Sequence, residues 1–145
     1  MEVEEIWRLF QRHMGYTDEE MEIFRSDPQK VKMVTQTPEF VKCRVVAEVI
    51  ESHGCHARHQ VGDRFVMTGG GQLITEECPK RMCMFALGPV SHALPVVYER
   101  FITKSDPNLE RFQIVQCTDV GLDKGGWGKI LMKVYVEKVP EKSET

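Results

Sequence analysis

Apolar side chains recur at every second position in three segments of this chain, and this alternation limits the fold more than any other feature. Residues 41–49, 111–117 and 129–139 share the period. In a β-strand, such a period places one face in a core and the other in solvent. The expected core positions of the first segment are Val41, Cys43, Val45, Ala47 and Val49. With a shorter run at residues 64–68, these segments predict a sheet of about four strands.

The first forty residues follow a helical pattern instead. Apolar residues recur at helical spacing up to Gly15, the TDEE motif from Thr17 has the form of a capping box, and Pro28 suits the first turn of a further helix. We therefore expect an N-terminal helical cap over residues 1–40, within the same domain as an α+β core over 41–139. Residues 140–145 are expected to form a frayed tail.

Between the two pairs of strands, residues 79–87 and 90–102 are predicted to form two helices. The break is expected at Gly88-Pro89, and the second helix is expected to kink at Pro95. Strands grouped on either side of helices are typical of an α+β fold. The sequence thus predicts a single domain in which helices cover one face of a mainly antiparallel sheet.

Charge and composition exclude several classes of partner. The formal net charge is −3, and Lys and Arg are scattered without a basic stripe, so no nucleic-acid partner is expected. The chain shows no secretory signal and no apolar run long enough for a bilayer, so we expect a cytoplasmic protein with no membrane partner. Five cysteines, an odd number, predict free thiols or metal ligands rather than a disulfide framework.

Three cysteines and one histidine are candidates for the ligands of one metal site. Cys55 and His59 have the C-x3-H spacing with which a loop can offer two ligands to one ion. Cys78 precedes Pro79 and is expected at a helix N-terminus, where the helix dipole favours a thiolate. Cys117 ends the third predicted strand. Soft thiolates with an imidazole suit zinc or an iron–sulfur cluster.

Cys83 and Cys43 are predicted to be core thiols instead. On one helix, Cys78 and Cys83 would differ by about 140° in direction and about 7.5 Å in rise, too far apart for one small ion. Cys83 also lies among apolar residues, and Cys43 is on the apolar face of the first strand. No C-x2-C pair anchors the four candidates, so spacing alone favours the interpretation that they are unrelated.

Three motifs, CHARHQVGDRF, ECPKRMCMFAL and VQCTD, together resemble a family of small uncharacterised proteins. Its members carry a Cys, a Gly-His, a Val-Gly-Asp-x-Phe, a Cys-Pro before a helix and a Cys-Pro-Asp. The resemblance covers roughly residues 41–138. It involves Cys55, His59, Val61, Gly62, Asp63, Phe65, Cys78, Pro79, Cys117 and Asp119. Arg58 and Thr118 depart from the family's Gly and Pro. The resemblance implies no established reaction, but the four candidate ligands recur in it as motif anchors.

The leading hypothesis is a cytoplasmic metal-binding domain. With four ligands the zinc or iron–sulfur site would be closed, and the protein would act as a binding module or an accessory subunit of a larger enzyme. With three ligands, an open position would make a small metalloenzyme, with Asp63 or Asp119 as general base. Asp63 is also expected to accept a hydrogen bond from the second ring nitrogen of His59.

Two alternatives stay open. In a metal-free thiol enzyme, Cys78 would be the nucleophile, His59 the base and Asp119 the carboxylate that orients it. In a non-enzymatic interaction protein, the apolar side chains of the helical cap and Trp127 would form an interface, and the protein would be a homo-oligomer. The cap residues concerned are Trp7, Phe10 and Met14.

Overall fold

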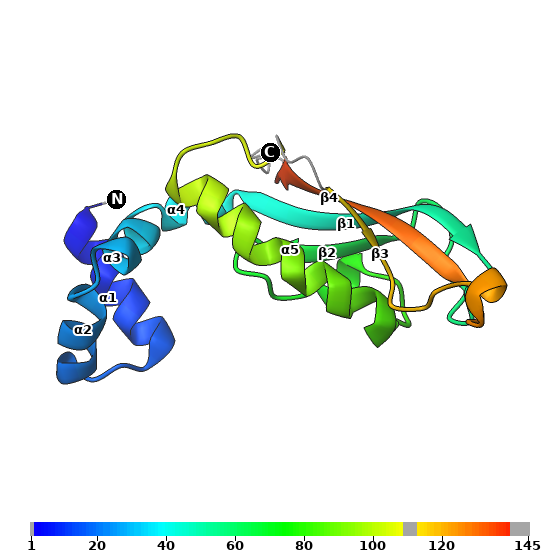
Figure 1. The fold of residues 1–145 in the computed structure, drawn as a ribbon. Coiled ribbons are helices and arrows are strands. Elements are labelled where there is room, and N and C mark those ends of the chain that lie inside the picture. Colours follow the sequence, from blue (N-terminus) through cyan, green and yellow to red (C-terminus); the bar gives the residue numbers. More distant parts are fainter. Residues whose placement is uncertain (1, 109–112, 140–145) are drawn as a thin grey trace, which may run out of the picture. The chain divides into compact units, whose positions relative to one another are not determined.

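The computed structural model describes residues 2–108 and 113–139, in two compact units with a boundary after Glu39 (Figure 1). The helices are α1 (Val3–Met14), α2 (Asp18–Arg25), α3 (Pro28–Thr35), α4 (Thr37–Val41) and α5 (Met84–Ile102), with short 3-10 turns η1 (Thr75–Glu77) and η2 (Leu122–Lys124). The strands are β1 (Cys43–His53), β2 (Arg64–Thr68), β3 (Ile114–Gln116) and β4 (Lys129–Lys138). The α+β class is confirmed, whereas a single domain for both units stays a prediction. The predicted tail at 140–145 lies outside the described residues.

The N-terminal unit consists of the predicted helices. Gly15 ends α1 in the left-handed conformation, with a φ of 72°, and the capping box forms reciprocally between Thr17 and Glu20. The core of this unit is formed by Ile6, Trp7, Met21 and Val34. Trp7 is therefore buried inside its own unit, and of the apolar stripe expected to favour a dimer only Met14 is exposed. The homo-oligomer stays a prediction.

The sheet has the order β2-β1-β4-β3, and all neighbouring strands are antiparallel. The predicted alternation is confirmed in β1, where Val45, Ala47 and Val49 are fully buried. The expected start at Val41 was wrong, because this residue ends α4 and its side chain is 65% exposed. The third strand is shorter than expected, and residues 111 and 112 of the predicted segment lie outside the described residues.

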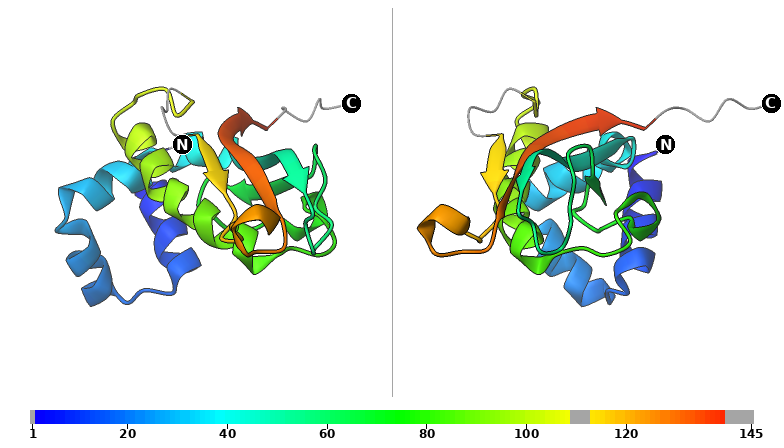
Figure 2. Two further views of the ribbon diagram at one scale, coloured as in Figure 1. Left: turned by 45° about the vertical axis from the view of Figure 1, so that its right-hand side comes forward. Right: turned by 90° about the vertical axis from the view of Figure 1, so that its right-hand side faces the viewer.

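One long helix, α5, runs along one face of the sheet and packs Ala86, Val90 and Val97 against it (Figures 1 and 2). Residues 90–102 are helical as predicted, but as part of α5. The separate helix predicted at 79–87 and the break at Gly88-Pro89 were wrong, since residues 79–83 are not helical and α5 continues through Gly88-Pro89. Two features permit this. Gly88 has no Cβ to collide with the proline ring, and the Phe85 carbonyl that Pro89 leaves free accepts the N–H of Thr118 at 3.0 Å.

The opposite face of the sheet carries charged side chains. Arg64 on β2 hydrogen-bonds to Glu137 on β4, and its Nε lies 3.9 Å from Glu48 on β1. The hydroxyl of Tyr135 donates to the same Glu48 carboxylate at 3.0 Å. Charged and hydroxyl groups thus link three strands on this face, beside the side chains of Val46 and Val66, which share the face and are buried. Among residues 2–108 and 113–139, no helix has the length and apolar character needed to cross a bilayer.

Candidate functional site

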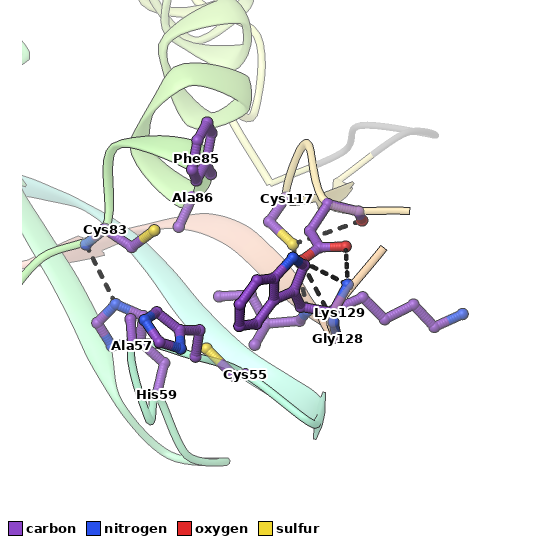
Figure 3. Close-up of a pocket in the computed structure, with 13 residues that line it drawn as sticks. Cys55, Ala57, His59, Cys83, Phe85, Ala86, Cys117, Gly128 and Lys129 are labelled. Carbon is purple, nitrogen blue, oxygen red and sulfur yellow. Dashed lines mark hydrogen bonds between the residues drawn. The ribbon is translucent and has the colours of Figure 1, made fainter. Parts of the chain in front are cut away.

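A cavity of about 260 Å³ lies in the sheet unit where the β1–β2 loop, the start of α5 and the β3–β4 loop meet. The residues that line it include three cysteines and a buried histidine from distant parts of the sequence: Cys55, Cys83, Cys117 and His59. Figure 3 shows the sulfur atoms of the three cysteines around the same space. Three of the four predicted ligands are thus brought together, and the fourth member of the group is Cys83 rather than Cys78.

The loop that carries Cys55 is held against the start of β4 by a close approach of two backbones. Gly54 adopts a φ of 63°, and a Cβ added to Gly128 would meet the Gly54 carbonyl oxygen at 2.1 Å. Only glycine fits at position 128, so the two loops that carry Cys55 and Cys117 stay adjacent. Arg58 in the same loop also has a positive φ, of 60°. Glycine adopts this conformation most readily, and residues other than glycine adopt it uncommonly.

His59 is almost fully buried, with 3% of its surface exposed, and both of its ring nitrogens face protein groups. Nε2 accepts the backbone N–H of Cys83 at 3.2 Å, so the ring carries its proton on Nδ1, which lies 3.7 Å from Oδ2 of Asp63. Asp63 in turn accepts the N–H of Gln60 at 3.0 Å. The distance to Asp63 is longer than a hydrogen bond, so its role as an acceptor for His59 stays a prediction, whereas the bond from Cys83 joins His59 to the start of α5.

Cys83 is the N-cap residue of α5, and its side chain makes no capping hydrogen bond. The N-terminus of a helix favours negative charge, which suits a thiolate at this position. The interpretation of Cys83 as a core thiol accounts for only part of its surroundings: it packs against the core but also lines the cavity. Cys83, directly before Met84, is not one of the usual N-cap residues Ser, Thr, Asp and Asn. The sequence therefore carried no capping signal for a helix that starts here.

Cys78 lies outside the residues that line the cavity. The structure places it after η1 and not at a helix N-terminus, so that expectation was wrong. Its sulfur accepts the N–H of Val66 at 3.2 Å and donates to the Val66 carbonyl oxygen at 3.4 Å. β2 is an edge strand, so the Cys78 sulfur satisfies a Val66 N–H that the sheet leaves unpaired, whereas the Val66 carbonyl also accepts the N–H of Ile74 at 2.9 Å. The alternative trio of Cys78, His59 and Asp119 is therefore not assembled around this cavity.

Cys117 is held by backbone contacts on both sides. Its N–H donates to the Ile130 carbonyl at 3.2 Å, and its sulfur accepts the N–H of Ile130 at 3.4 Å. Such a bond strengthens when the sulfur carries negative charge. The next residue, Thr118, donates to the Phe85 carbonyl, which ties the Cys117 segment to the first turn of α5.

The Asp119 carboxylate holds the two ends of the β3–β4 loop together. Its carboxylate accepts backbone N–H groups from Gly121 at 3.0 Å, Trp127 at 3.1 Å and Gly128 at 3.2 Å. These bonds, that of Gly121 foremost, hold the pKa of the carboxyl below its usual value. A carboxylate engaged in this way is a poor general base, so the arrangement favours a structural role for Asp119.

We expect Asp119→Asn to weaken the closed loop and remove its response to acid. Because the pKa of Asp119 is lowered by folding, its stabilising effect is present above the ordinary carboxyl pKa and is lost as pH falls through the lowered value. The wild-type amide chemical shifts of Gly121, Trp127 and Gly128 should therefore move in acid, measured by NMR. In Asp119→Asn they should differ at neutral pH and show no such transition, while Asp123→Asn should behave as wild type. If the three amide shifts moved in acid as much in Asp119→Asn as in Asp123→Asn, this role of Asp119 would be contradicted.

No family model, curated protein or solved structure matches this chain, so the resemblance drawn from its motifs stays a prediction. All five cysteines are free. Within the parts of the chain that the structure describes, no group of three or more His, Cys, Asp or Glu side chains is arranged to hold a metal ion. The three cavity cysteines are therefore neighbours, but their sulfurs are not in a coordinating arrangement.

Proposed function

We propose that the protein is a small metal-binding protein whose centre, a zinc ion or an iron–sulfur cluster, is held by the thiolates of Cys55, Cys83 and Cys117. The observation that carries the proposal is that three thiols from separate segments line one cavity. Thiolates are soft ligands that select zinc and iron–sulfur clusters over magnesium or calcium. The proposal keeps the metal class predicted from the sequence and assigns to Cys83 the place first given to Cys78.

Metal binding requires the cysteine side chains to rotate, because no three candidate ligands stand in coordinating positions. A change of the χ1 angle moves a sulfur without moving the backbone. The backbone contacts described above hold all three segments around the cavity, and the hydrogen bond from Ile130 and the N-terminus of α5 both favour negatively charged sulfur. The proposed centre thus needs side-chain adjustment and no change of fold.

His59 supports this centre and does not bind the metal. Its Nε2 already accepts the Cys83 N–H, and its Nδ1 faces Asp63. If His59 bound the metal, one of its ring nitrogens would have to give up its present contact while the side chain stays buried. Partners of this kind orient the ligands, and their loss commonly lowers metal affinity about 10–100-fold. Three protein ligands leave a fourth position open, which is the arrangement of catalytic rather than structural zinc sites.

Metal analysis of the anaerobically purified full chain tests the proposal. We expect about one zinc per chain, or iron with sulfide and a brown colour. Removal of the metal with a chelator should lower the midpoint of thermal unfolding by about 10 °C, because a ligand bound only by the folded state stabilises it. A chain that takes up neither metal, and whose unfolding does not respond to the chelator, would contradict the proposal.

One observation favours a second candidate, a metal-free thiol enzyme. The Cys83 thiol stands at the N-terminus of α5 beside the buried His59, with Asp63 behind the imidazole. In this function Cys83, and not Cys78, would be the nucleophile, and His59 would act as the base after its Nε2 exchanges the backbone N–H of Cys83 for the thiol proton. Rapid alkylation of Cys83 in a colourless protein without metal would favour this candidate over the metal centre.

A further inference from the structure

The cavity at the start of α5 has a buried apolar inner wall and an exposed aromatic mouth. Ala86 and Ile130 line it and are buried in the core of the sheet unit. Phe85 and Trp127 also line it, yet they are 66% and 72% exposed, so their rings form its edge toward solvent. Almost all of the surface inside belongs to apolar atoms. Mostly apolar and aromatic walls are the usual construction of a small-molecule site.

The segments that carry this mouth are held in place by backbone hydrogen bonds. The Phe85 carbonyl accepts the N–H of Thr118 at 3.0 Å, which joins α5 to the β3–β4 loop. The N–H of Trp127 donates to Oδ1 of Asp119 at 3.1 Å, so the backbone of this residue is fixed although its indole is exposed. Filling a cavity whose walls already stand in place costs less conformational entropy. The two aromatic side chains thus lie at the mouth of a preformed cavity.

The ionisable side chains that line the cavity are turned away or already engaged. Figure 3 shows the Lys129 ammonium directed away from the cysteines. The Asp119 carboxylate is bound by three backbone N–H groups, and Nε2 of His59 accepts another. The ring of His56 packs edge-on against Trp127, with centroids 5.2 Å apart. These groups would give a charged ligand little compensation for the hydration that it loses on entering, and that loss is costly.

The size and the rim of the cavity indicate what fits inside. Its volume is about 260 Å³, whereas an apolar cavity of about 150 Å³ is large enough to bind benzene. It therefore has room for one benzene ring that carries a short substituent. Such a ring would cover exposed apolar surface of Phe85 and Trp127, and aromatic rings pack favourably edge-on or offset against one another.

We infer that the cavity binds an uncharged aromatic molecule, a benzene ring with a short substituent, through apolar contact with Phe85, Trp127 and the buried wall behind them. The volume sets the size of this molecule, and the engaged polar groups select against charge. The two rings at the mouth favour an aromatic occupant. Such binding goes beyond the proposed function, because it depends on the cavity walls and on no bound metal.

Calorimetric titration of the full chain with three planar compounds of nearly equal size tests the inference. Acetophenone is uncharged, whereas at neutral pH benzoate is an anion and benzamidine a cation. We expect acetophenone to bind at least about tenfold more tightly than either of the others, because the charged compounds lose more hydration. Benzoate is the sharper competitor, since the N-terminus of α5 favours an anion. Equal or tighter binding of either charged compound, or no binding of acetophenone, would overturn the inference.

Substitutions at the mouth locate the binding. Phe85→Ala and Trp127→Ala should each weaken binding of acetophenone by at least about fivefold, because each removes an apolar wall. Phe85→Ala keeps the carbonyl that accepts Thr118 and introduces a good helix former, so it should unfold thermally as cooperatively as the wild type. The control Met84→Ala changes a neighbouring side chain that is 73% exposed and does not line the cavity, so binding should be unchanged. Equal affinities of Phe85→Ala and Met84→Ala for acetophenone would overturn the inference.

Discussion

Replacing Cys83 with serine is expected to abolish metal binding by the full chain, whereas the same change at Cys78 should leave the metal content unchanged. Cys83 lines the cavity beside Cys55 and Cys117, while the Cys78 sulfur is engaged with the backbone of Val66. Removal of a thiolate ligand should cost more than the about 10–100-fold typical of residues that only orient a ligand. Metal content after dialysis against a weak chelator measures the difference.

Thermal unfolding of both variants provides the control for folding. A serine at position 78 can still accept the N–H of Val66, so Cys78→Ser should unfold cooperatively and with its metal bound. If Cys78→Ser lost the metal and Cys83→Ser kept it, the ligand set first predicted from the sequence would be restored. If both variants kept it, the cavity would not be the metal site.

The sequence places the start of the helix at Cys78, whereas the structure places it at Cys83, and this difference has a physical cause. Proline is common at the first position of a helix, so from the local sequence Cys78, which precedes Pro79, was the better candidate for a helix start. Two long-range contacts decided otherwise: Val66 binds the Cys78 sulfur at the edge of β2, and Thr118 binds the Phe85 carbonyl that Pro89 leaves free. Neither contact leaves a local pattern, so neither could be foreseen.

Features that depend on short-range chemistry were predictable. The capping box at Thr17, the stop at Gly15 and the buried face of β1 all follow from residues a few positions apart. In the site, Cys55 and Cys117 were chosen for the chemistry of their side chains and for their places after strands, and the sheet brings both to one cavity. The backbone hydrogen bonds of Asp119 were not predictable, because they depend on the path of the whole loop.

Gly128→Ala is expected to destabilise the sheet unit by about 3 kcal/mol or more and to weaken metal binding as well. A Cβ at position 128 would lie 2.1 Å from the Gly54 carbonyl oxygen and 2.5 Å from that of His53, both of them backbone atoms that no side-chain rotation can move. The end of β1 must therefore move away from the start of β4, and Cys55 moves with it. Urea unfolding measures the loss of stability, and metal titration of the folded variant measures the loss of affinity.

Gly70→Ala is the matched control, since it makes the same substitution in the same unit. The nearest atom to an added Cβ there is Oε1 of Gln72 at 3.3 Å, the end of a flexible side chain at an exposed turn. Its stability should stay within about 0.5 kcal/mol of the wild type, with unchanged metal affinity. Equal stability of both variants would show that β1 and β4 tolerate separation at this point. A destabilised Gly128→Ala with unchanged metal affinity would show instead that the position of Cys55 does not depend on the contact between Gly54 and Gly128.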